Sequence, residues 1–447
     1  MKPLLMLAAE LATRKTTSQA LVEDALMRIA MPSGEGARVF MRTHRESALA
    51  EAKASDTLRA HGIVPSPLAG IPVSVKDLFD VAGDITRAGS KALADAAPAM
   101  ADATVVRRLR QAGAIIVGRT NMVEFAFSGL GLNPHYGTPK NPWDRATGRI
   151  PGGSSSGAAV SVSDGMAAMG LGTDTAGSVR VPAALCGLTG FKPTARRIPK
   201  DGTFPLSTTL DSIGPIAPSV ACCALVDSIL AGCAPQVPPA LPLKGLRLGV
   251  VQDYVLDGLD GAVAEVFGKA LARLSQAGAS VTDVRFEALQ RLPQINQKGG
   301  LVLAEAYAIH RELIARRKAD YDPRVASRTL RGADMSAADY IEVLAQRATM
   351  IADSARLATP YDALLMPTVV MVAPAIAPLE TDFQLYGKTD RAILRNPSVV
   401  NFLDGCALSI PCHQRGEAPV GLMVVGQCAE DRHLLAVGLA LESALSQ

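Results

Sequence analysis

Two short tracts of small residues are the places where a hydroxyl nucleophile could act in this chain. The first is Pro151–Gly157, with the sequence PGGSSSG, and the second is Gly172–Arg180, with the sequence GTDTAGSVR. A serine hydroxyl is almost fully protonated at neutral pH, so it must give its proton to a neighbouring base before it can attack a carbonyl carbon. The two tracts therefore predict a serine-based site if the fold brings a base to them.

The first tract has two interpretations on its own residues. A run of glycines and serines is typical of a flexible loop or linker. The same residues also match G-x-S-x-G, the nucleophile elbow of many hydrolases, with Ser155 at the central position. An elbow follows a strand directly, whereas residues 144–153 contain Gly148, Pro151 and two further glycines and are not typical of a strand. Both interpretations stay open, with the elbow the weaker one.

The second tract suits a turn that binds an oxyanion. The apolar run Met166–Leu171 predicts a strand that ends at Gly172. Ala176 and Gly177 would then let the backbone turn tightly at Ser178. Successive backbone N–H groups in such a turn can point into one concavity, where they stabilise a developing negative charge. A turn that binds an anion without any chemistry is the alternative interpretation.

Lys76 is the candidate base for such a serine. It ends the apolar stretch Pro72–Lys76, where a lysine side chain would lose its hydration. A lone lysine is most often a surface charge, and it can act as a base only in its neutral form. Lowering a lysine pKa from about 10.4 to about 7.4 costs roughly 4 kcal/mol, and burial can shift such a pKa by about 3–5 units. Burial of Lys76 would therefore be sufficient.

The sequence contains no pattern typical of a metal site or of an organic cofactor. It has no H-E-x-x-H, no Walker A sequence, and no G-x-G-x-x-G that opens a helix after a strand. The histidines lack metal-ligand spacing and none lies near either tract in the sequence: His44, His61, His135, His310, His413 and His433. We therefore expect neither a metal nor a cofactor.

The elements that must position these residues alternate between helix and strand, which predicts an α/β fold with helices on both faces of a sheet. Apolar runs predict buried strands at Ile71–Val75, Ala114–Gly118, Met166–Leu171, Leu246–Val251, Ala363–Met366 and Val420–Val425. Helices are expected after Thr16–Ser18, where apolar residues recur at helical spacing, and at residues 104–112, 158–163 and 220–230.

One domain over residues 1–447 is the organisation that we expect. It would begin with a helical segment at about residues 1–60. A Pro-rich stretch at about residues 234–243, APQVPPALPL, would form an extended surface connector between a motif-rich first half and a motif-poor second half. The fixed φ angles of its prolines suit such a connector.

The composition predicts an ordered chain whose partner is a small molecule. The residues are 48% hydrophobic and 19% charged, and Lys+Arg 45 against Asp+Glu 42 leaves a formal charge of +3. This balance gives no electrostatic reason to bind nucleic acid or an anionic membrane. The uncharged run Ala363–Leu379 contains three prolines, which would break a membrane-spanning helix. An odd number of cysteines without a C-x-x-C pair favours reduced thiols and a cytoplasmic location.

Taken together, several blocks of this sequence resemble the amidase signature family of serine hydrolases. They are Leu68–Asp77 (LAGIPVSVKD), Gly118–Glu124 (GRTNMVE), Pro151–Gly157, Gly172–Arg180, Pro182–Thr194 and Pro419–Leu422. The resemblance covers most of the chain. It implies an amidase-signature α/β fold with a central mixed sheet. It also implies hydrolysis of a carboxamide to a carboxylic acid and ammonia or an amine, without a metal or cofactor.

The resemblance also implies roles for individual residues. Ser178 would be the nucleophile, Ser154 the bridging serine after a cis peptide bond, and Lys76 the base of a Ser-cisSer-Lys triad. Neutral Lys76 would take a proton from Ser154 while Ser154 takes one from Ser178, and an acyl-enzyme would form. The oxyanion hole would consist of the backbone N–H groups of Thr175, Ala176, Gly177 and Ser178.

Ser155, Asp174 and Arg180 are expected to support this site. By resemblance, Ser155 contributes hydrogen bonds, and we expect Asp174 and Arg180 to form a buried ion pair around the loop. The sequence departs from the family pattern at Ala176, where many members have glycine. It departs again at residues 404–406, Asp-Gly-Cys, where relatives often carry Gly-x-Pro. The second departure leaves the acyl pocket undefined.

The family also contains the glutaminase component of the glutamyl-tRNA amidotransferase, which hydrolyses glutamine and passes ammonia to a partner. There an arginine on a late helix binds the substrate carboxylate, and Arg347 holds a comparable place, although a helical arginine is most often solvated. We expect a stand-alone amidase rather than that component, with a small-molecule amide as substrate and a homodimer as a candidate assembly. A Ser-His-Asp α/β-hydrolase that uses Ser155, and a non-enzymatic binding protein, are the remaining alternatives.

Overall fold

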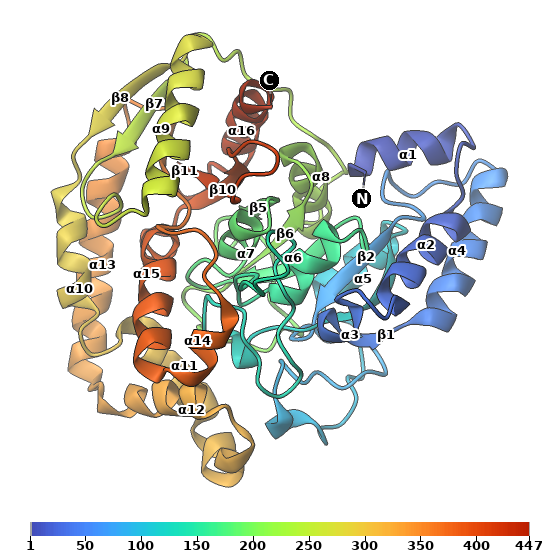
Figure 1. Cartoon of the computed structure of the whole chain (residues 1–447), viewed down its shortest axis with the longest axis horizontal. Coiled ribbons are helices and arrows are strands. Elements are labelled where there is room, and N and C mark those ends of the chain that lie inside the picture. Colours follow the sequence, from blue (N-terminus) through green and yellow to red (C-terminus); the bar gives the residue numbers. More distant parts are fainter. Residues whose placement is uncertain (1, 447) are drawn as a thin grey trace.

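One mixed sheet runs through the chain in the computed structural model, which describes residues 2–446 (Figure 1). The strand order is β1-β3-β2-β4-β6-β5-β10-β11-β9-β7-β8. Strand β2 pairs in parallel with β3 and β4, β7 pairs in parallel with β8 and β9, and the other pairs are antiparallel. The strands are β1 (Phe40–Thr43), β2 (Pro72–Lys76), β3 (Ile115–Thr120), β4 (Gly170–Asp174), β5 (Thr189–Lys192), β6 (Ser212–Ala217), β7 (Arg247–Val251), β8 (Ser280–Val284), β9 (Ala363–Pro367), β10 (Cys406–Pro411) and β11 (Gly421–Gly426).

Helices cover both faces of this sheet, as predicted. One face packs against α2 (Ser18–Ala30), α4 (Arg45–Ala60), α6 (Ser156–Ser163), α7 (Arg180–Leu185), α13 (Ala337–Ala358) and α15 (Phe383–Phe402). The other face packs against α1 (Leu4–Ala12), α5 (Thr104–Gln111), α8 (Val220–Leu230), α9 (Gly261–Gln276) and α16 (Asp431–Leu445). In Figure 1 the N-terminal helices α1, α2 and α4 and the later helix α13 lie at opposite ends of the molecule. The predicted α/β fold is therefore confirmed.

The remaining helices are shorter or lie beyond the sheet. They are α3 (Gly36–Val39), α10 (Leu292–Ile295), α11 (Gly300–Arg317), α12 (Pro323–Leu330) and α14 (Ile376–Thr381). Single 3₁₀ turns occur at Lys91–Leu93, Glu124–Ala126, Glu287–Arg291, Lys318–Asp320 and Arg331–Asp334. None of the helices within residues 2–446 combines the length and the apolar composition needed to cross a bilayer.

The predicted helix after Thr16–Ser18 is α2, and its local chemistry explains where it begins. The Thr17 side chain accepts a hydrogen bond from the Ala20 N–H and caps the helix. Val22, Ala25 and Ile29 are buried on one face, as their spacing predicts. The segment predicted as helical at about residues 1–60 also contains the edge strand β1, which the sequence pattern did not indicate.

The predicted strand Met166–Leu171 is wrong in position, because the strand β4 runs over Gly170–Asp174. A Cβ atom at Gly170 would lie 2.8 Å from the Ala158 carbonyl oxygen, and one at Gly172 would lie 2.7 Å from Ser155 Oγ. Glycines therefore let helix α6 lie directly on this strand. The shift matters for the site, because it makes Asp174 the last residue of β4.

The two halves of the sequence meet inside the sheet. Strands β1–β6 come before residues 234–243 and strands β7–β11 come after them. The halves join where β5 pairs with β10, with Phe191 opposite Leu408. Residues 234–243 themselves form neither helix nor strand and are mostly exposed.

Candidate active site

The predicted site lies where β2 and β4 end, side by side and parallel. Lys76 is the last residue of β2 and Asp174 is the last residue of β4. The carboxyl ends of neighbouring parallel strands form a common edge of the sheet, a usual place for ligand sites in α/β folds. Helix α6 begins directly after Ser154 and Ser155, and helix α7 begins shortly after Ser178. The fold thus brings both serine tracts to the lysine.

Lys76 is fully buried and touches one of the predicted serines. Its Nζ donates hydrogen bonds to Ser154 Oγ at 2.7 Å and to Thr173 Oγ1 at 2.8 Å. Burial lowers the pKa of Lys76 to about 7, although the negative charges of Asp211 and Asp174 act in the opposite direction. A substantial fraction of this amine is therefore neutral at neutral pH and can accept a proton.

The first tract is a packed part of the core and not a linker. All of residues 151–157 are buried, which corrects the flexible-loop interpretation. The peptide bond between Gly153 and Ser154 is cis, as the family resemblance implies. The Ser154 carbonyl accepts a hydrogen bond from the Val123 N–H at 3.1 Å, and a Cβ atom at Gly153 would lie 2.7 Å from the Gly131 nitrogen. Close backbone contacts therefore require these glycines.

Ser155 has neither surrounding that an elbow nucleophile needs. Its hydroxyl donates to the Thr173 carbonyl at 3.3 Å, and within residues 2–446 no histidine is hydrogen-bonded to it. No strand precedes it, since residues 144–155 contain only turns, bends and an isolated bridge. The elbow interpretation therefore has no support from the structure.

Ser178 lies on the loop between β4 and α7, with a residue exposure of only 4%. Its carbonyl accepts the Ser155 N–H at 3.2 Å, so the two tracts are joined through their backbones. Among the hydrogen bonds of residues 2–446, none involves the Ser178 hydroxyl. The hydroxyl is therefore free to turn toward a substrate or toward Ser154.

The backbone N–H groups of this loop divide into two sets. Gly177 donates to Asp174 Oδ1 at 2.8 Å and Val179 donates to Asp174 Oδ2 at 3.1 Å. The N–H groups of Thr175, Ala176 and Ser178 have no hydrogen-bond partner within residues 2–446. Of the four predicted oxyanion donors, Gly177 is thus already occupied by a carboxylate, and the other three are available.

Asp174 and Arg180 form the buried ion pair that was expected from the sequence. Two hydrogen bonds join them, from Arg180 Nε to Oδ2 at 3.0 Å and from Nη2 to Oδ1 at 2.9 Å, and neither side chain is exposed. Burial tends to raise the pKa of Asp174, but the Arg180 guanidinium lowers it well below its usual range. Asn401 accepts a hydrogen bond from Arg180 and donates one to Asp174, a role that no sequence pattern indicated.

Three further polar residues at the site were missed. Thr173 holds the Lys76 amine, and Asp211 accepts a hydrogen bond from the Thr175 hydroxyl. Lys192 is buried on β5, and burial lowers its pKa to about 8, aided by the charge of Arg180. Thr173 and Lys192 lie within blocks that match the family, so their position was a usable signal. Asp211 lies in no such block.

Arg347 is held by its own chain on α13. Its Nε donates to the Phe402 carbonyl at 2.8 Å, and its Nη2 lies 3.8 Å from Asp404 Oδ1. Asp404 also pairs with Arg196, at 3.1 Å. Within residues 2–446 no hydrogen bond or ion pair joins Arg347 to the serines or to Lys76. Its predicted role as a substrate-binding residue stays a prediction.

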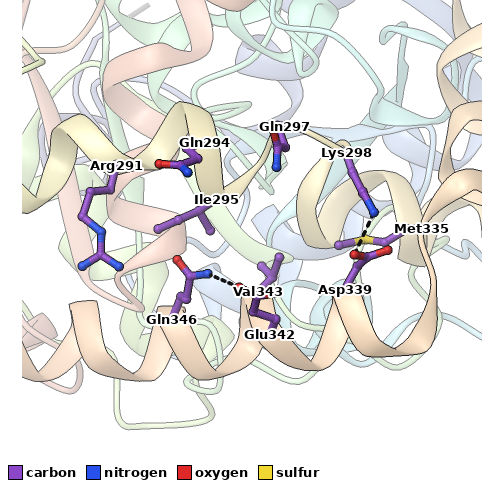
Figure 2. A pocket seen from close by; sticks show the side chains of 10 residues that line it. All are labelled: Arg291, Gln294, Ile295, Gln297, Lys298, Met335, Asp339, Glu342, Val343 and Gln346. Atoms are coloured by element: carbon purple, nitrogen blue, oxygen red, sulfur yellow. Dashed lines mark hydrogen bonds and ion pairs between the residues drawn. The ribbon is translucent and has the colours of Figure 1, made fainter.

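A pocket of about 230 Å³ between α10 and α13 is separate from these residues (Figure 2). Figure 2 shows that its polar side chains largely face one another. Lys298 donates to Asp339 at 2.8 Å and Gln346 donates to Glu342 at 3.0 Å. None of the predicted site residues lines this pocket.

Comparison with protein families gives one assignment for most of the chain. Residues 21–435 match the model of the Amidase family. The 2-amino-5-chloromuconic acid deaminase of Comamonas testosteroni is 36% identical to the chain, over 98% of this chain and 95% of the relative. The GatA-type component of the glutamyl-tRNA(Gln) amidotransferase of Chloroflexus aggregans is 32% identical, over 97% of this chain and 94% of the relative.

A solved structure gives the same result in three dimensions. The crystal structure of an amidase superposes with a TM-score of 0.90 at 33% sequence identity. The match covers 99% of both chains.

Proposed function

Because the chain belongs to the amidase family, we propose that it hydrolyses a carboxamide C–N bond with Ser178, Ser154 and Lys76 as its catalytic residues. The main support is the fully buried Lys76 amine, whose nitrogen lies 2.7 Å from Ser154 Oγ and whose pKa is lowered to about 7. A buried lysine that is half neutral near pH 7 is the base that a serine nucleophile requires. The products are a carboxylic acid and ammonia or an amine.

The reaction proceeds by proton transfer along this row of three groups. Ser178 Oγ attacks the carbonyl carbon while its proton moves to Ser154 Oγ, and the Ser154 proton moves to Lys76 Nζ. The same relay returns a proton to the leaving nitrogen when the C–N bond breaks, which leaves an acyl group on Ser178. Water then attacks the ester carbonyl, and the serine is regenerated with release of the acid.

The oxyanion formed in the attack is stabilised by backbone N–H groups. Those of Thr175, Ala176 and Ser178 are free of protein partners within residues 2–446, whereas Gly177 would have to leave Asp174 to contribute. The Asp174–Arg180–Asn401 cluster keeps the loop in place through the Gly177 and Val179 N–H groups. Loss of one oxyanion donor typically reduces the rate by about 10²–10³-fold.

The substrate class that we propose is a small amide with a carboxylate. The name of the Comamonas relative describes action on an amino derivative of a chloromuconic acid, and glutamine, the substrate expected of the amidotransferase component, is also a carboxylic acid. Arg347 would bind that carboxylate. Its Nε and Nη2 already face the Phe402 carbonyl and Asp404, so its Nη1 is the group left to reach a ligand.

The experiment is hydrolysis of a panel of aliphatic, aryl and dicarboxylic amides by the purified protein, followed by ammonia release. We expect Ser178→Ala and Lys76→Ala to lose essentially all activity and Ser155→Ala to keep a measurable part of it. A fluorophosphonate should label Ser178 in the unchanged protein. Full activity in Ser178→Ala, or labelling that maps to Ser155, would contradict the proposal.

The second candidate function is that of the glutaminase component of a glutamyl-tRNA amidotransferase, supported by the 32% identity to the Chloroflexus protein over 97% of this chain. In that case glutaminase activity would appear only with co-purified partner proteins. Pull-down from the native host, followed by a glutaminase assay with and without the captured proteins, separates the two functions.

A further inference from the structure

Asp211 lies next to the loop of Ser178 because of the way β4 and β6 pair. The last residue pair of these antiparallel strands is Asp174 opposite Ser212, and Thr175 and Asp211 are the next residues outward. The Thr175 hydroxyl donates a hydrogen bond of 2.5 Å to Asp211 Oδ1, and both residues are buried. The carboxylate thus contacts the first residue of the loop, whereas the Asp174 carboxylate holds Gly177 further along it.

The other oxygen of Asp211 is also occupied. Asp211 Oδ2 accepts the backbone N–H groups of Leu206, at 2.9 Å, and Ser207, at 3.1 Å. With three donors on its two oxygens, the carboxylate has a single favourable orientation. It therefore fixes the position of the Thr175 side chain relative to the segment 206–211.

A second buried carboxylate anchors that segment to the helices of the later half. Glu305 on α11 accepts hydrogen bonds from the hydroxyls of Ser207 and Thr209 and from the Thr209 N–H. It also accepts the Tyr340 hydroxyl of α13 at 2.8 Å. The loop of Ser178 is thereby connected, through Asp211 and Glu305, to two helices that are distant in the sequence.

Asp211 also differs from Asp174 in its charge balance. Asp174 is paired with Arg180, whereas within residues 2–446 Asp211 forms no salt bridge, and Lys200 is the main positive charge that acts on it. Its negative charge acts on Lys76, as does that of Asp174. Removal of the Asp211 charge is therefore measurable at the base, separately from any movement of the loop.

From this geometry we infer that Asp211 is a positioning residue for hydrolysis: through the Thr175 hydroxyl it holds the loop whose N–H groups stabilise the oxyanion. The inference rests on the proposed function, because it assigns the loop that role. Asp211 itself forms no hydrogen bond with Ser178 or Lys76.

Three variants test this role by steady-state kinetics with the best amide of the panel. Thr175→Val keeps the shape and the backbone N–H but removes the hydroxyl, and we expect kcat to fall at least about tenfold with little change in KM. Thr175→Ser returns the hydroxyl and should recover most of the lost kcat. Asp211→Asn should also lower kcat. Thermal melting of each variant confirms that it is folded.

The pH profile distinguishes positioning from a general loss of structure. Asp211→Asn removes a negative charge that favours the protonated amine of Lys76, so the acidic limb of kcat/KM should move to lower pH by roughly half a unit or more. Thr175→Val keeps that charge and should leave the limb where it is in the unchanged protein. Asp174, Arg180 and Lys192, the other charged groups at this edge, are the same in all variants.

The inference would be overturned if Thr175→Val kept the kcat of the unchanged protein, or if Thr175→Ser lost as much activity as Thr175→Val. An acidic limb that did not move in Asp211→Asn would also overturn it. These outcomes differ from failure of the proposed function, because that failure is seen as activity in Ser178→Ala.

Discussion

At the scale of single residues, the burial of Lys76 costs free energy that the fold must supply elsewhere. A pKa lowered from 10.5 to about 7 corresponds to roughly 5 kcal/mol at neutral pH. The hydrogen bonds to Ser154 and Thr173 return part of this cost. Reactive groups are often held at such an expense, because the property that makes them reactive makes them unfavourable to bury.

This cost predicts that Lys76→Met is inactive but more stable than the unchanged protein. Between about pH 7 and 10.5 the unfolded chain holds a proton on Lys76 that the folded chain lacks, so stability rises with pH in this window. Methionine has a similar length and no proton to lose. We expect the variant to gain about 1–4 kcal/mol at neutral pH and the gain to shrink as the pH approaches 10.

Urea denaturation of both proteins at about pH 7 and about pH 9.5 measures this difference. Other titrating groups are common to the two proteins, so the change in the difference reports Lys76 alone. An equal gain in stability at both pH values would show that the lysine is already protonated when buried, which contradicts its role as a base.

At the scale of elements, the sequence predicted the strands that are continuous apolar runs and missed those that are not. Strands β2, β3, β7, β9 and β11 lie within two residues of their predicted positions. Strand β6, SIGPIA, contains glycine and proline, which are disfavoured in strands, yet it is buried at the centre of the sheet. Its neighbours β4 and β5 determine its conformation, and pairing between distant segments cannot be seen in a local window.

The same reason explains which site residues could be predicted. Lys76, Ser154 and Ser178 lie in blocks with a recognisable pattern, so the resemblance was sufficient to name them. Asp211 and Asn401 have no such pattern, and they reach the site only because β6 pairs with β4 and because α15 packs beside α7.

The contact between β4 and α6 gives a prediction at this scale. A Cβ atom at Gly170 would lie 2.8 Å from the Ala158 carbonyl oxygen, so Gly170→Ala forces strand and helix apart and should cost about 1–3 kcal/mol. Gly268→Ala on α9 is the matched control, since nothing lies within 4 Å of its Cβ position, and it should gain roughly 0.5–1 kcal/mol. Chemical denaturation of the two variants compares them. Equal stability of the two would mean that the α6 contact does not depend on glycine.

At the scale of the whole molecule, the order of the strands ties the two halves of the sequence together. The residues that we propose as catalytic all belong to the first half, and Asn401, which holds Asp174 and Arg180, belongs to the second. Glu305 and Tyr340 of the second half anchor the segment of Asp211. The site is therefore built on one half and held in shape by the other.

The junction of β5 and β10 lies in the interior of the sheet, whereas the covalent connection at residues 234–243 is mostly exposed. We therefore predict that cutting the chain at a protease site inserted after Pro235 leaves both activity and a single unfolding transition. The uncut protein with the same insertion is the control. Differential scanning calorimetry gives the test, because a calorimetric enthalpy equal to the van't Hoff enthalpy indicates one cooperative unit. Residues 1–235 expressed alone should aggregate, since they would expose the hydrogen-bonding edge of β5. If the cut protein instead unfolded in two separate transitions, the halves would be independent domains and the sheet would not be what holds the site together.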